Sequence, residues 1–466
     1  MGETSEMILE LLDALRSERH FLYSAGQLYE WLDGIYIPLE DHQLESYIEQ
    51  VANRRGMESL RTHVKREIAE HIKSDSFMST ADMQSYDKKH LLAFKNGFVN
   101  LLQLKEAGKV ELSKFDFAAG ERICKPLFFQ QIPHNLNIEM LAEVQSLGYN
   151  EPEVILSFYS PKIHQFLEDL IGKDRILLQL TKMGYCFLRA NPFKLMFMEL
   201  GAQDRGKTTY MKLLLHVIGY RNVNLAPLQD LANDPFAKAN LEHKLVNACD
   251  DLPPSMIKNM GIIKQLSGES PINSNRKFVQ ETHGFVNYSK LMFAGNKLPE
   301  LDDIEDEAFF SRWIITDYKN KFPRNEGFFD NLIADEKEIE GLIIASLYAL
   351  RDLLNGGSVF RTDTKSYVEM WKRQINTVYD FIKTITETGG YALGPSETID
   401  KDDFYNSYSE FMEGRIGTVE SKTKFTQECQ RLFKITATRS SDRKTHIYRG
   451  IGTKSSQTHI DDADDV

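Results

Sequence analysis

The chain has 466 residues, of which 42% are hydrophobic and 27% charged, and its formal net charge is −12. This length predicts two or three domains, and the charge argues against general coating of nucleic acid while leaving a local basic channel open. No apolar run approaches the ~20 residues of a membrane span, and the four cysteines lack zinc-ligand or disulfide spacing, so we expect a cytoplasmic protein with no membrane partner.

Residues 1–165 are predicted to form a mainly helical domain, which would serve as a collar or in oligomerisation. A turn at Asp33-Gly34 predicts a hairpin near its start, and residues 94–101 predict a strand, a turn and a second strand. Apolar residues at helical spacing predict helices over residues 5–16, 40–54, 57–73, 137–147, 151–170 and 175–189.

The most informative stretch begins with an apolar run at Leu195 that ends at Gly201. Residues 201–208, GAQDRGKT, fit the pattern GxxxxGK[ST]. Glycines let backbone N–H groups surround a β-phosphate, the lysine reaches the β and γ oxygens, and the hydroxyl binds Mg²⁺. An amphipathic helix is predicted to follow, with its N-terminus facing the phosphates; the alternative is a surface loop before a core helix. The expected nucleotide-binding residues are Gly201, Asp204, Arg205, Gly206, Lys207, Thr208 and Thr209.

Two further apolar strands are predicted to end in polar residues. The strand at 244–249 ends in Asp250 and Asp251, which suit a site where one carboxylate joins Thr208 at Mg²⁺ and the other polarises water. Asn296 follows the strand at 291–294 and could position that water through its amide. The alternatives are an Asp-Asp turn before two prolines and an asparagine that only forms a turn.

Arg312 lies 16 residues after Asn296, at the start of another apolar run. Such an arginine could reach the γ-phosphate of a neighbouring subunit as a finger, a role that contributes ~10³ to 10⁵ in rate in other enzymes. The alternative is a surface ion pair with a nearby acidic residue.

A helix that ends near Gly268 and a hairpin are predicted between the acids and the asparagine. The hairpin would present a basic pair beside an aromatic ring, which suits a nucleic acid backbone with a base or sugar resting on the ring. Basic pairs are, however, more often simply solvated. The expected nucleic acid contacts are Lys264, Arg276, Lys277 and Phe278.

Strands and helices are predicted to alternate from residue 190 to about 345, which indicates a parallel sheet with nucleotide at its carboxyl edge, and the domain that contains this sheet is predicted to span residues 166–345. Residues 346–455 are predicted to form a small winged-helix-like domain, and residues 456–466 an acidic disordered tail. The elements expected in the small domain are helices at 367–388, 401–413 and 422–434 and a hairpin of 434–438 with 446–450.

Taken in order, these motifs resemble the superfamily 3 helicases, AAA+-type ring motors of small viruses and plasmids. The poxvirus-type and the phage or plasmid primase-helicases are the more similar branch, over about residues 20–450. The resemblance implies a multidomain α/β fold with an AAA+-like P-loop core. It also implies Asn296 as phosphate sensor, Arg312 as a finger acting in trans, and Lys277 and Phe278 at positions that track DNA. Many members have Lys-His there, so Phe278 departs from the pattern.

The resemblance implies an ATP- and Mg²⁺-dependent DNA helicase, a hexameric ring that moves 3′ to 5′ during replication of a virus or plasmid. No acidic metal site of the primase type is found in residues 1–150, so a separate primase or primase-polymerase is an expected partner. Two alternatives remain: an AAA+ ATPase that loads or remodels a protein without unwinding DNA, and a small-molecule kinase. The hairpin that carries Lys277 distinguishes a DNA helicase from the protein remodeller, and a trans-acting Arg312 argues against the small-molecule kinase.

Overall fold

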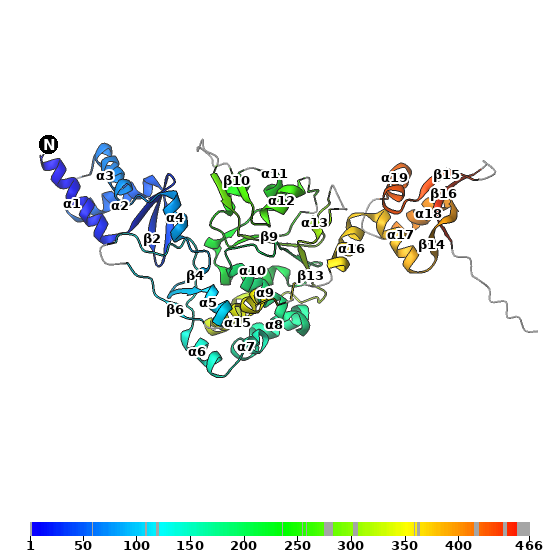
Figure 1. The fold of residues 1–466 in the computed structure, drawn as a ribbon, viewed down its shortest axis with the longest axis horizontal. Helices are drawn as coiled ribbons and strands as arrows, with labels where there is room; N and C mark the ends of the chain where they lie inside the picture. Colours follow the sequence, from blue (N-terminus) through cyan, green and yellow to red (C-terminus); the bar gives the residue numbers. More distant parts are fainter. Residues whose placement is uncertain are drawn as a thin grey trace, which may run out of the picture. The chain divides into compact units, whose positions relative to one another are not determined.

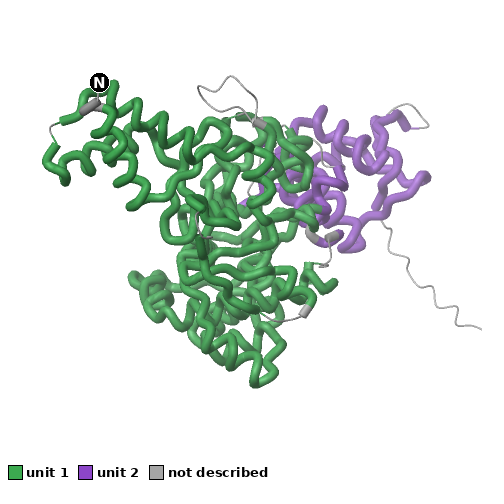
Figure 2. The backbone as a smooth tube through the Cα atoms, turned by 60° about the vertical axis from the view of Figure 1, so that its left-hand side comes forward, with its two compact units in different colours: residues 1–253, 257–296, 312–362 green, residues 254–256, 297–311, 363–466 purple. Residues whose placement is uncertain are grey.

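The computed structural model describes residues 2–57, 59–107, 110–117, 121–234, 236–253, 255–257, 259–274, 283–301, 306–357, 359–360, 364–413, 419–440 and 445–453. The predicted acidic tail at 456–466 lies outside these ranges. The chain forms two units, coloured separately in Figure 2. The first comprises residues 1–253, 257–296 and 312–362, and the second comprises residues 254–256, 297–311 and 363–466.

Unit 1 begins with helices and a three-stranded antiparallel sheet. The predicted turn at Asp33-Gly34 is confirmed: both residues have positive φ, and they join β2 (Gln27–Leu32) to β3 (Ile35–Leu39). The sequence prediction missed β1 (Phe21–Ser24), which pairs with β2. The helices are α1 (Gly2–Glu18), α2 (Asp41–Arg54), α3 (Thr62–Asp75) and α4 (Thr80–Tyr86).

A second small sheet and a group of helices follow. The predicted strand, turn and strand are β4 (Leu91–Phe94) and β5 (Gly97–Asn100), next to β6 (Leu112–Ser113). The single helix predicted over 151–170 is wrong, because Pro161 lacks an N–H and turns Ser160 out of the helical region, to φ −137° and ψ 56°. The helices are α5 (Leu101–Ala107), α6 (Ile138–Ser146), α7 (Pro152–Tyr159), α8 (Pro161–Ile171) and α9 (Ile176–Phe187).

The centre of unit 1 is a five-stranded sheet in the order β13-β7-β12-β9-β8, with every neighbouring pair parallel. Helices α9, α10 and α15 lie on one side of it and α11 and α12 on the other (Figure 1), so its central strands are buried on both faces. The strands are β7 (Met196–Leu200), β8 (Val223–Asn224), β9 (Val246–Asp250), β12 (Lys290–Gly295) and β13 (Trp313–Asp317). The helices are α10 (Lys207–Ile218), α11 (Leu228–Asn233), α12 (Met260–Leu266), α14 (Phe328–Ile333) and α15 (Glu336–Leu354).

The register of this sheet fixes which polar residues meet. Leu200 is paired with Gly295, and Ala294 with Asp250, so the carboxyl ends of β7, β12 and β9 lie together. At the opposite end Trp313 is paired with Met196. The residues that follow β7, β9 and β12 therefore share one edge of the sheet.

Unit 2 is a small domain with its own core. The helix predicted over 367–388 is two helices, because Asn376 leaves the helical region and its side chain caps the second one. The predicted hairpin belongs to a three-stranded sheet in the order β14-β16-β15, of which the sequence prediction missed β14. The elements are α13 (Glu307–Phe310), α16 (Thr364–Ile375), α17 (Thr377–Glu387), β14 (Tyr391–Asp400), α18 (Lys401–Met412), α19 (Lys422–Phe433), β15 (Thr436–Arg439) and β16 (His446–Thr453).

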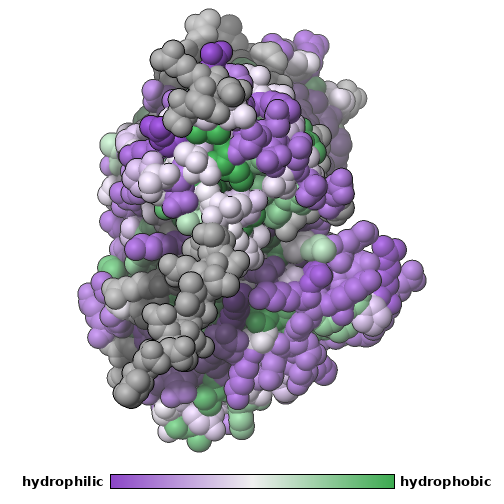
Figure 3. All heavy atoms as spheres, turned by 90° about the vertical axis from the view of Figure 1, so that its right-hand side faces the viewer, coloured by the Kyte–Doolittle hydropathy of each residue, from purple (hydrophilic) through white to green (hydrophobic). Residues whose placement is uncertain are grey.

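The face in Figure 3 is largely hydrophilic, with apolar side chains in small areas. Within the described ranges no helix is long and apolar enough to cross a membrane.

Candidate functional site

The loop at residues 201–206, which joins β7 to α10, depends on two glycines. A Cβ atom on Gly201 would lie 2.7 Å from the carbonyl oxygen of Tyr318, and one on Gly206 would lie 2.4 Å from Cδ1 of Leu170. Gly206 also has a φ of 81° immediately before α10, a conformation that favours glycine. Any larger residue at either position would displace its neighbours.

The ammonium of Lys207 lies against this loop at the start of α10. The residue is only 9% exposed. Its Nζ donates to the carbonyl oxygens of Gly201 at 2.5 Å and Ala202 at 2.8 Å, and to Oδ1 of Asn296 at 3.0 Å. The three N–H donors of the ammonium thus have three oxygen acceptors, two from the loop and one from the residue after β12.

Two exposed carboxylates lie at the carboxyl end of β9, that of its last residue, Asp250, and that of Asp251 directly after it. Thr208 Oγ1 donates to Oδ1 of Asp250 at 3.2 Å, and the Asp251 N–H donates to the carbonyl of Ala294 at 3.1 Å. Asp251 has a φ of 98°, which is rare for a residue other than glycine and marks a strained backbone. Burial lowers the pKa of Lys207, while Asp250 and Asp251 oppose this shift. An anion at the loop would further favour the charged lysine.

Arg312 lies at the amino-terminal end of the parallel strands, opposite the end at which the loop lies. Its carbonyl accepts from the N–H of Met196, the first residue of β7, and its own strand then runs toward the loop. The five residues of β13 span ~16 Å at ~3.3 Å each. The structure therefore brings Lys207, Thr208 and Asp250 together with the neighbouring Asn296, whereas Arg312 of the same chain begins the strand at its far end.

The segment of residues 318–324, which follows β13, binds directly to the loop. Tyr318 donates its N–H to the carbonyl of Leu200 at 2.7 Å, and Phe322 donates its N–H to the carbonyl of Asp204 at 2.9 Å. The Arg205 guanidinium in turn donates to the carbonyl of Tyr318 at 3.4 Å. Asp204 and Arg205, predicted to bind nucleotide, are thus used at least in part to attach this segment.

A cavity of about 1030 Å³ adjoins the loop. Asp204, Gly206 and Thr209 line it on the loop side, and Phe166 and Phe322 are among its aromatic walls. Its lining also includes several charged side chains, so aromatic rings that could pack on a flat organic ring lie beside groups that could bind a polar ligand.

The sequence prediction missed a buried polar cluster under the loop. Lys182 of α9 and Glu199 of β7 are fully buried and form an ion pair of 2.7 Å. Lys182 also donates to Thr316 Oγ1, and Tyr318 OH donates to Oε2 of Glu199 at 2.8 Å. An acid inside the apolar run before the loop was the available signal, because a buried carboxylate requires a partner.

The hairpin predicted after α12 is present as β10 (Pro271–Ser274) paired with β11 (His283–Val286). Lys264 lies in the last turn of α12, half-buried. The expected contacts at Arg276, Lys277 and Phe278 lie outside the described residues.

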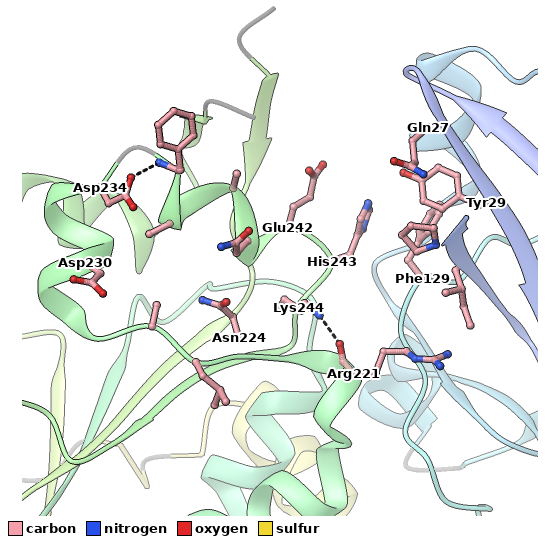
Figure 4. Close-up of a pocket in the computed structure, with 18 of the residues that line it drawn as sticks. Gln27, Tyr29, Phe129, Arg221, Asn224, Asp230, Asp234, Glu242, His243 and Lys244 are labelled. Atoms are coloured by element: carbon pink, nitrogen blue, oxygen red, sulfur yellow. Dashed lines mark hydrogen bonds between the residues drawn. The ribbon is translucent and has the colours of Figure 1, made fainter. Parts of the chain in front are cut away.

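A second cavity, of about 940 Å³, contains none of the predicted site residues (Figure 4). Tyr29 and Phe129 line one side, Asp230 the other, and His243 and Lys244 lie between them. The rings of Phe129 and His243 stack with centroids 4.5 Å apart. Because acidic and basic side chains both line this cavity, its charge favours no particular ligand.

The chain was compared with known families, curated proteins and solved structures. Residues 200–312 match the sequence model of a family described as "Family of unknown function (DUF5906)". No curated protein matches. Solved structures of the "NrS-1 C terminal region" are similar at TM-scores of 0.40, 0.43 and 0.42 and at 10%, 10% and 11% identity. The alignments cover 95%, 96% and 95% of this chain and 98%, 99% and 99% of those chains.

Proposed function

We propose that this chain is an ATP hydrolase that works as a ring-forming DNA helicase in the replication of a virus or plasmid. The ring would be a hexamer that moves 3′ to 5′ along one strand. The observation that supports this most is the placement of Lys207, Thr208, Asp250 and Asn296 at one sheet edge, with Arg312 at the other.

The groups at the carboxyl end of the sheet, where the loop and Lys207 lie, are suited to binding a nucleoside triphosphate. The N-terminus of the 12-residue α10 presents backbone N–H groups beside the Lys207 ammonium, which suits phosphate oxygens. The γ-phosphate would replace the carbonyl acceptors of Lys207 while Asn296 remains in reach. The cavity lined by Phe166 and Phe322 would take the base and sugar.

A magnesium ion fits the oxygen donors that are present. Thr208 Oγ1 and Asp250 Oδ1 lie 3.2 Å apart, and Mg²⁺ prefers one or two protein oxygens together with substrate phosphates. No cluster of three or more His, Cys, Asp or Glu that could hold a metal occurs among the described residues, which matches this sparse ligand set. When bound, the ion would neutralise charge that develops on the phosphate oxygens.

In the proposed hydrolysis each polar residue has one task. Lys207 holds the β and γ oxygens, and Asp251 accepts a hydrogen bond from the attacking water and thereby orients it. Asn296 contacts the γ-phosphate, and it loses this contact when the phosphate leaves. Arg312 of an adjacent subunit stabilises the charge on the transferred phosphoryl group, because its own strand starts ~16 Å from the loop edge of its own sheet.

Strand movement would be produced by the hairpin of β10 and β11. Its arms follow α12, which carries Lys264, and β11 leads into β12, after which Asn296 is the next residue. A sensor at the end of β12 is therefore connected to the hairpin through a continuous stretch of chain. We propose that Lys277 contacts the DNA backbone and moves with the nucleotide state.

Mixing two inactive variants tests whether the ATP site is shared between subunits. Lys207→Ala removes the phosphate contact and Arg312→Ala removes the finger, so each variant alone should lose ATP hydrolysis. In an equal mixture about a quarter of the interfaces combine an intact loop with an intact arginine, and activity should reappear at about that fraction. No recovery in mixed rings, or full activity in a dilute monomer, would refute a site completed in trans.

Unwinding of forked DNA tests the helicase assignment. We expect ATP-dependent strand separation that is lost in Lys207→Ala and in Lys277→Ala, with single-stranded DNA no longer stimulating hydrolysis in the latter. Forks with only a 3′ or only a 5′ loading strand establish the direction. ATP hydrolysis without separation of any fork would refute the helicase and favour an ATPase that remodels a protein partner.

A further inference from the structure

The chain leaves and re-enters unit 1 beside two residues of the proposed ATP site. Asn296 is the last residue of unit 1 before the chain passes into unit 2 at this point, and Arg312 is the first residue after it returns. The stretch between them, residues 297–311, belongs to unit 2 (Figure 2), and we call it the inserted segment. The structure describes residues 297–301 and 306–311 of this segment. A residue of unit 2 that holds the segment is therefore connected through the chain to Asn296 and Arg312.

Trp371 of α16 contacts both ends of the inserted segment, and its side chain is fully buried. Its Nε1–H donates to the carbonyl oxygen of Pro299, three residues after Asn296, at 3.3 Å. The ring centroids of Phe309 and Phe310 in α13 lie 5.9 and 5.7 Å from the ring of Trp371. Both pairs are edge-to-face, which is a favourable arrangement of aromatic rings. One side chain of α16 thus joins the start of the inserted segment to its end.

Helix α13, at the end of the inserted segment, stops one residue before Arg312. The side chain of Asp306 caps the helix, because it accepts a hydrogen bond from the N–H of the third helical residue at 3.0 Å. The N–H of Ser311 donates to the carbonyl oxygen of the first helical residue at 2.9 Å. Since Ser311 is bonded back to α13, the position of Arg312 follows that of the helix, which packs on Trp371.

Asn296 and Arg312 differ in how they are held. The side chain of Asn296 accepts a hydrogen bond from Nζ of Lys207 at 3.0 Å, a contact within unit 1. Arg312 is bonded within unit 1 through its carbonyl oxygen, which accepts from the N–H of Met196 at 2.7 Å, while the residue before it is bonded to α13. A shift of α13 therefore acts first on Arg312, because Asn296 lies at the other end of the segment and is held by Lys207.

The helix that carries Trp371 is fixed to the rest of unit 2. The OH of Tyr379 in α17 donates to Oε2 of Glu369 in α16 at 2.6 Å. The amide of Asn376, which lies between these two helices, donates to Oε2 of Glu428 in α19 at 2.8 Å. Trp371 is thus a link between the folded body of unit 2 and the inserted segment.

We propose that Trp371 is a positioning residue for ATP hydrolysis, which holds α13 and thereby fixes Arg312 where it reaches the phosphate in a neighbouring subunit. This role rests on the proposed function, because it requires Arg312 to act in trans. Unit 2 thus influences the rate of hydrolysis in the next subunit through the inserted segment. Its effect is on the rate and not on the binding of ATP to its own subunit.

Steady-state ATP hydrolysis by the full chain gives the first readout. A misplacement of ~1 Å in a reacting group can cost ~10²-fold in rate, so Trp371→Ala should lower kcat about tenfold or more and change KM by less than about twofold. Trp371→Phe keeps a ring against Phe309 and Phe310 and loses the bond to Pro299, so its kcat should stay within about threefold of the parent.

Two further variants separate positioning from loss of stability. Phe310→Ala removes a partner ring from α13 and leaves α16 intact, so it should lower kcat by a factor similar to that of Trp371→Ala. The matched control, Met412→Ala, removes a buried side chain from the core of unit 2 and should keep the parental kcat. An unchanged kcat in Trp371→Ala, or an equal loss in Met412→Ala, would overturn the proposal.

Mixed rings show which subunit Trp371 serves. In an equal mixture of Lys207→Ala and Arg312→Ala chains, an active site combines the loop of the second chain with the arginine of the first. Adding Trp371→Ala to the Lys207→Ala chain, which supplies the arginine, should lower the recovered activity by about the same factor as it lowers kcat. Adding it to the Arg312→Ala chain, which supplies the loop, should leave the recovered activity within about twofold. An equal or larger loss with this second placement would overturn the proposal.

The reference mixture without Trp371→Ala separates this role from the proposed function. If that mixture recovers activity and Trp371→Ala lowers neither kcat nor the recovery, the shared ATP site stands and the positioning role is refuted. If the reference mixture recovers no activity, the ATP site is not completed in trans, and the positioning role falls with it.

Discussion

The fully buried ion pair beneath the loop yields the sharpest stability prediction. Lys182→Met leaves the Glu199 carboxylate in the interior with only the Tyr318 hydroxyl as donor, since the ammonium at 2.7 Å is gone. Both partners have 0% exposure, so water cannot replace the lost contact. An uncompensated buried charge of this kind costs ~3 to 5 kcal/mol in the free energy of unfolding.

Removing the second charge should reverse most of this loss. In Lys182→Met/Glu199→Gln neither side chain is charged, and the amide oxygen that replaces the carboxylate is still an acceptor for Tyr318. We expect the double variant to be more stable than Lys182→Met by ~2 kcal/mol or more, even though it has lost both halves of the pair. The order of stability is therefore parent, double variant, single variant.

The assay must report on this sheet and not on the rest of the chain. The chain has three tryptophans, and Trp313 begins β13, the neighbour of β7. In a background of Trp31→Phe and Trp371→Phe, urea titration followed by Trp313 fluorescence measures the sheet that contains Glu199. If the single and double variants agree within ~0.5 kcal/mol, Glu199 is not left as an uncompensated charge and the reasoning fails.

Three further predictions concern packing, pH and metal. Gly184→Ala should lower the free energy of unfolding by ~1 to 3 kcal/mol, because its Cβ would lie 2.2 Å from the carbonyl oxygen of Ser346. The control is Gly261→Ala, whose Cβ would have its nearest neighbour at 3.6 Å. It should be neutral or stabilising in the same urea titration. Burial lowers the pKa of Lys290 from 10.5 to about 7, so between these pH values the unfolded chain binds more protons than the folded chain. The stability of the parent relative to Lys290→Met should therefore rise with pH from about 7 to about 10. A difference in stability that stays constant over this range would contradict the pKa shift. Thr208→Val should raise the Mg²⁺ concentration needed for half-maximal ATP hydrolysis by tenfold or more, and an unchanged requirement in a magnesium titration would exclude its hydroxyl as a ligand.

The sequence predicted the elements around the site better than their attachments. Strand ends at Asp250 and Asn296 were predictable because apolar runs ending in polar residues place those residues at one edge of a parallel sheet. The attachment of residues 318–324 to the loop was not, because two of its hydrogen bonds join backbone atoms and the others join side chains such as that of Arg205 to groups far away in the sequence. The partner of Glu199 was equally hidden, since Lys182 lies on a preceding helix and only the fold brings it near.

The sequence also could not tell whether Arg312 acts in the ATP site of its own subunit. The register of β13 with β7 bears on this question. Arg312 starts β13 beside Met196, while the loop follows the other end of β7, and the segment after β13 is bonded to Leu200 and Asp204. One strand thus has the proposed finger at one end and attachments to its own loop at the other. A neighbour's phosphate bound to Arg312 would affect the loop through β13, which is hydrogen-bonded to β7. We therefore expect Arg312→Ala to alter the ATP affinity of its own subunit as well as ATP hydrolysis in the neighbouring subunit. Binding of ATP to the Arg312→Ala chain is measured in rings whose hydrolysis is blocked by Asp251→Asn in every subunit. Each site in these rings lacks both its own arginine and that of its neighbour, so unchanged affinity would show that Arg312 contributes to ATP binding neither along β13 nor across the interface, and would refute the coupling.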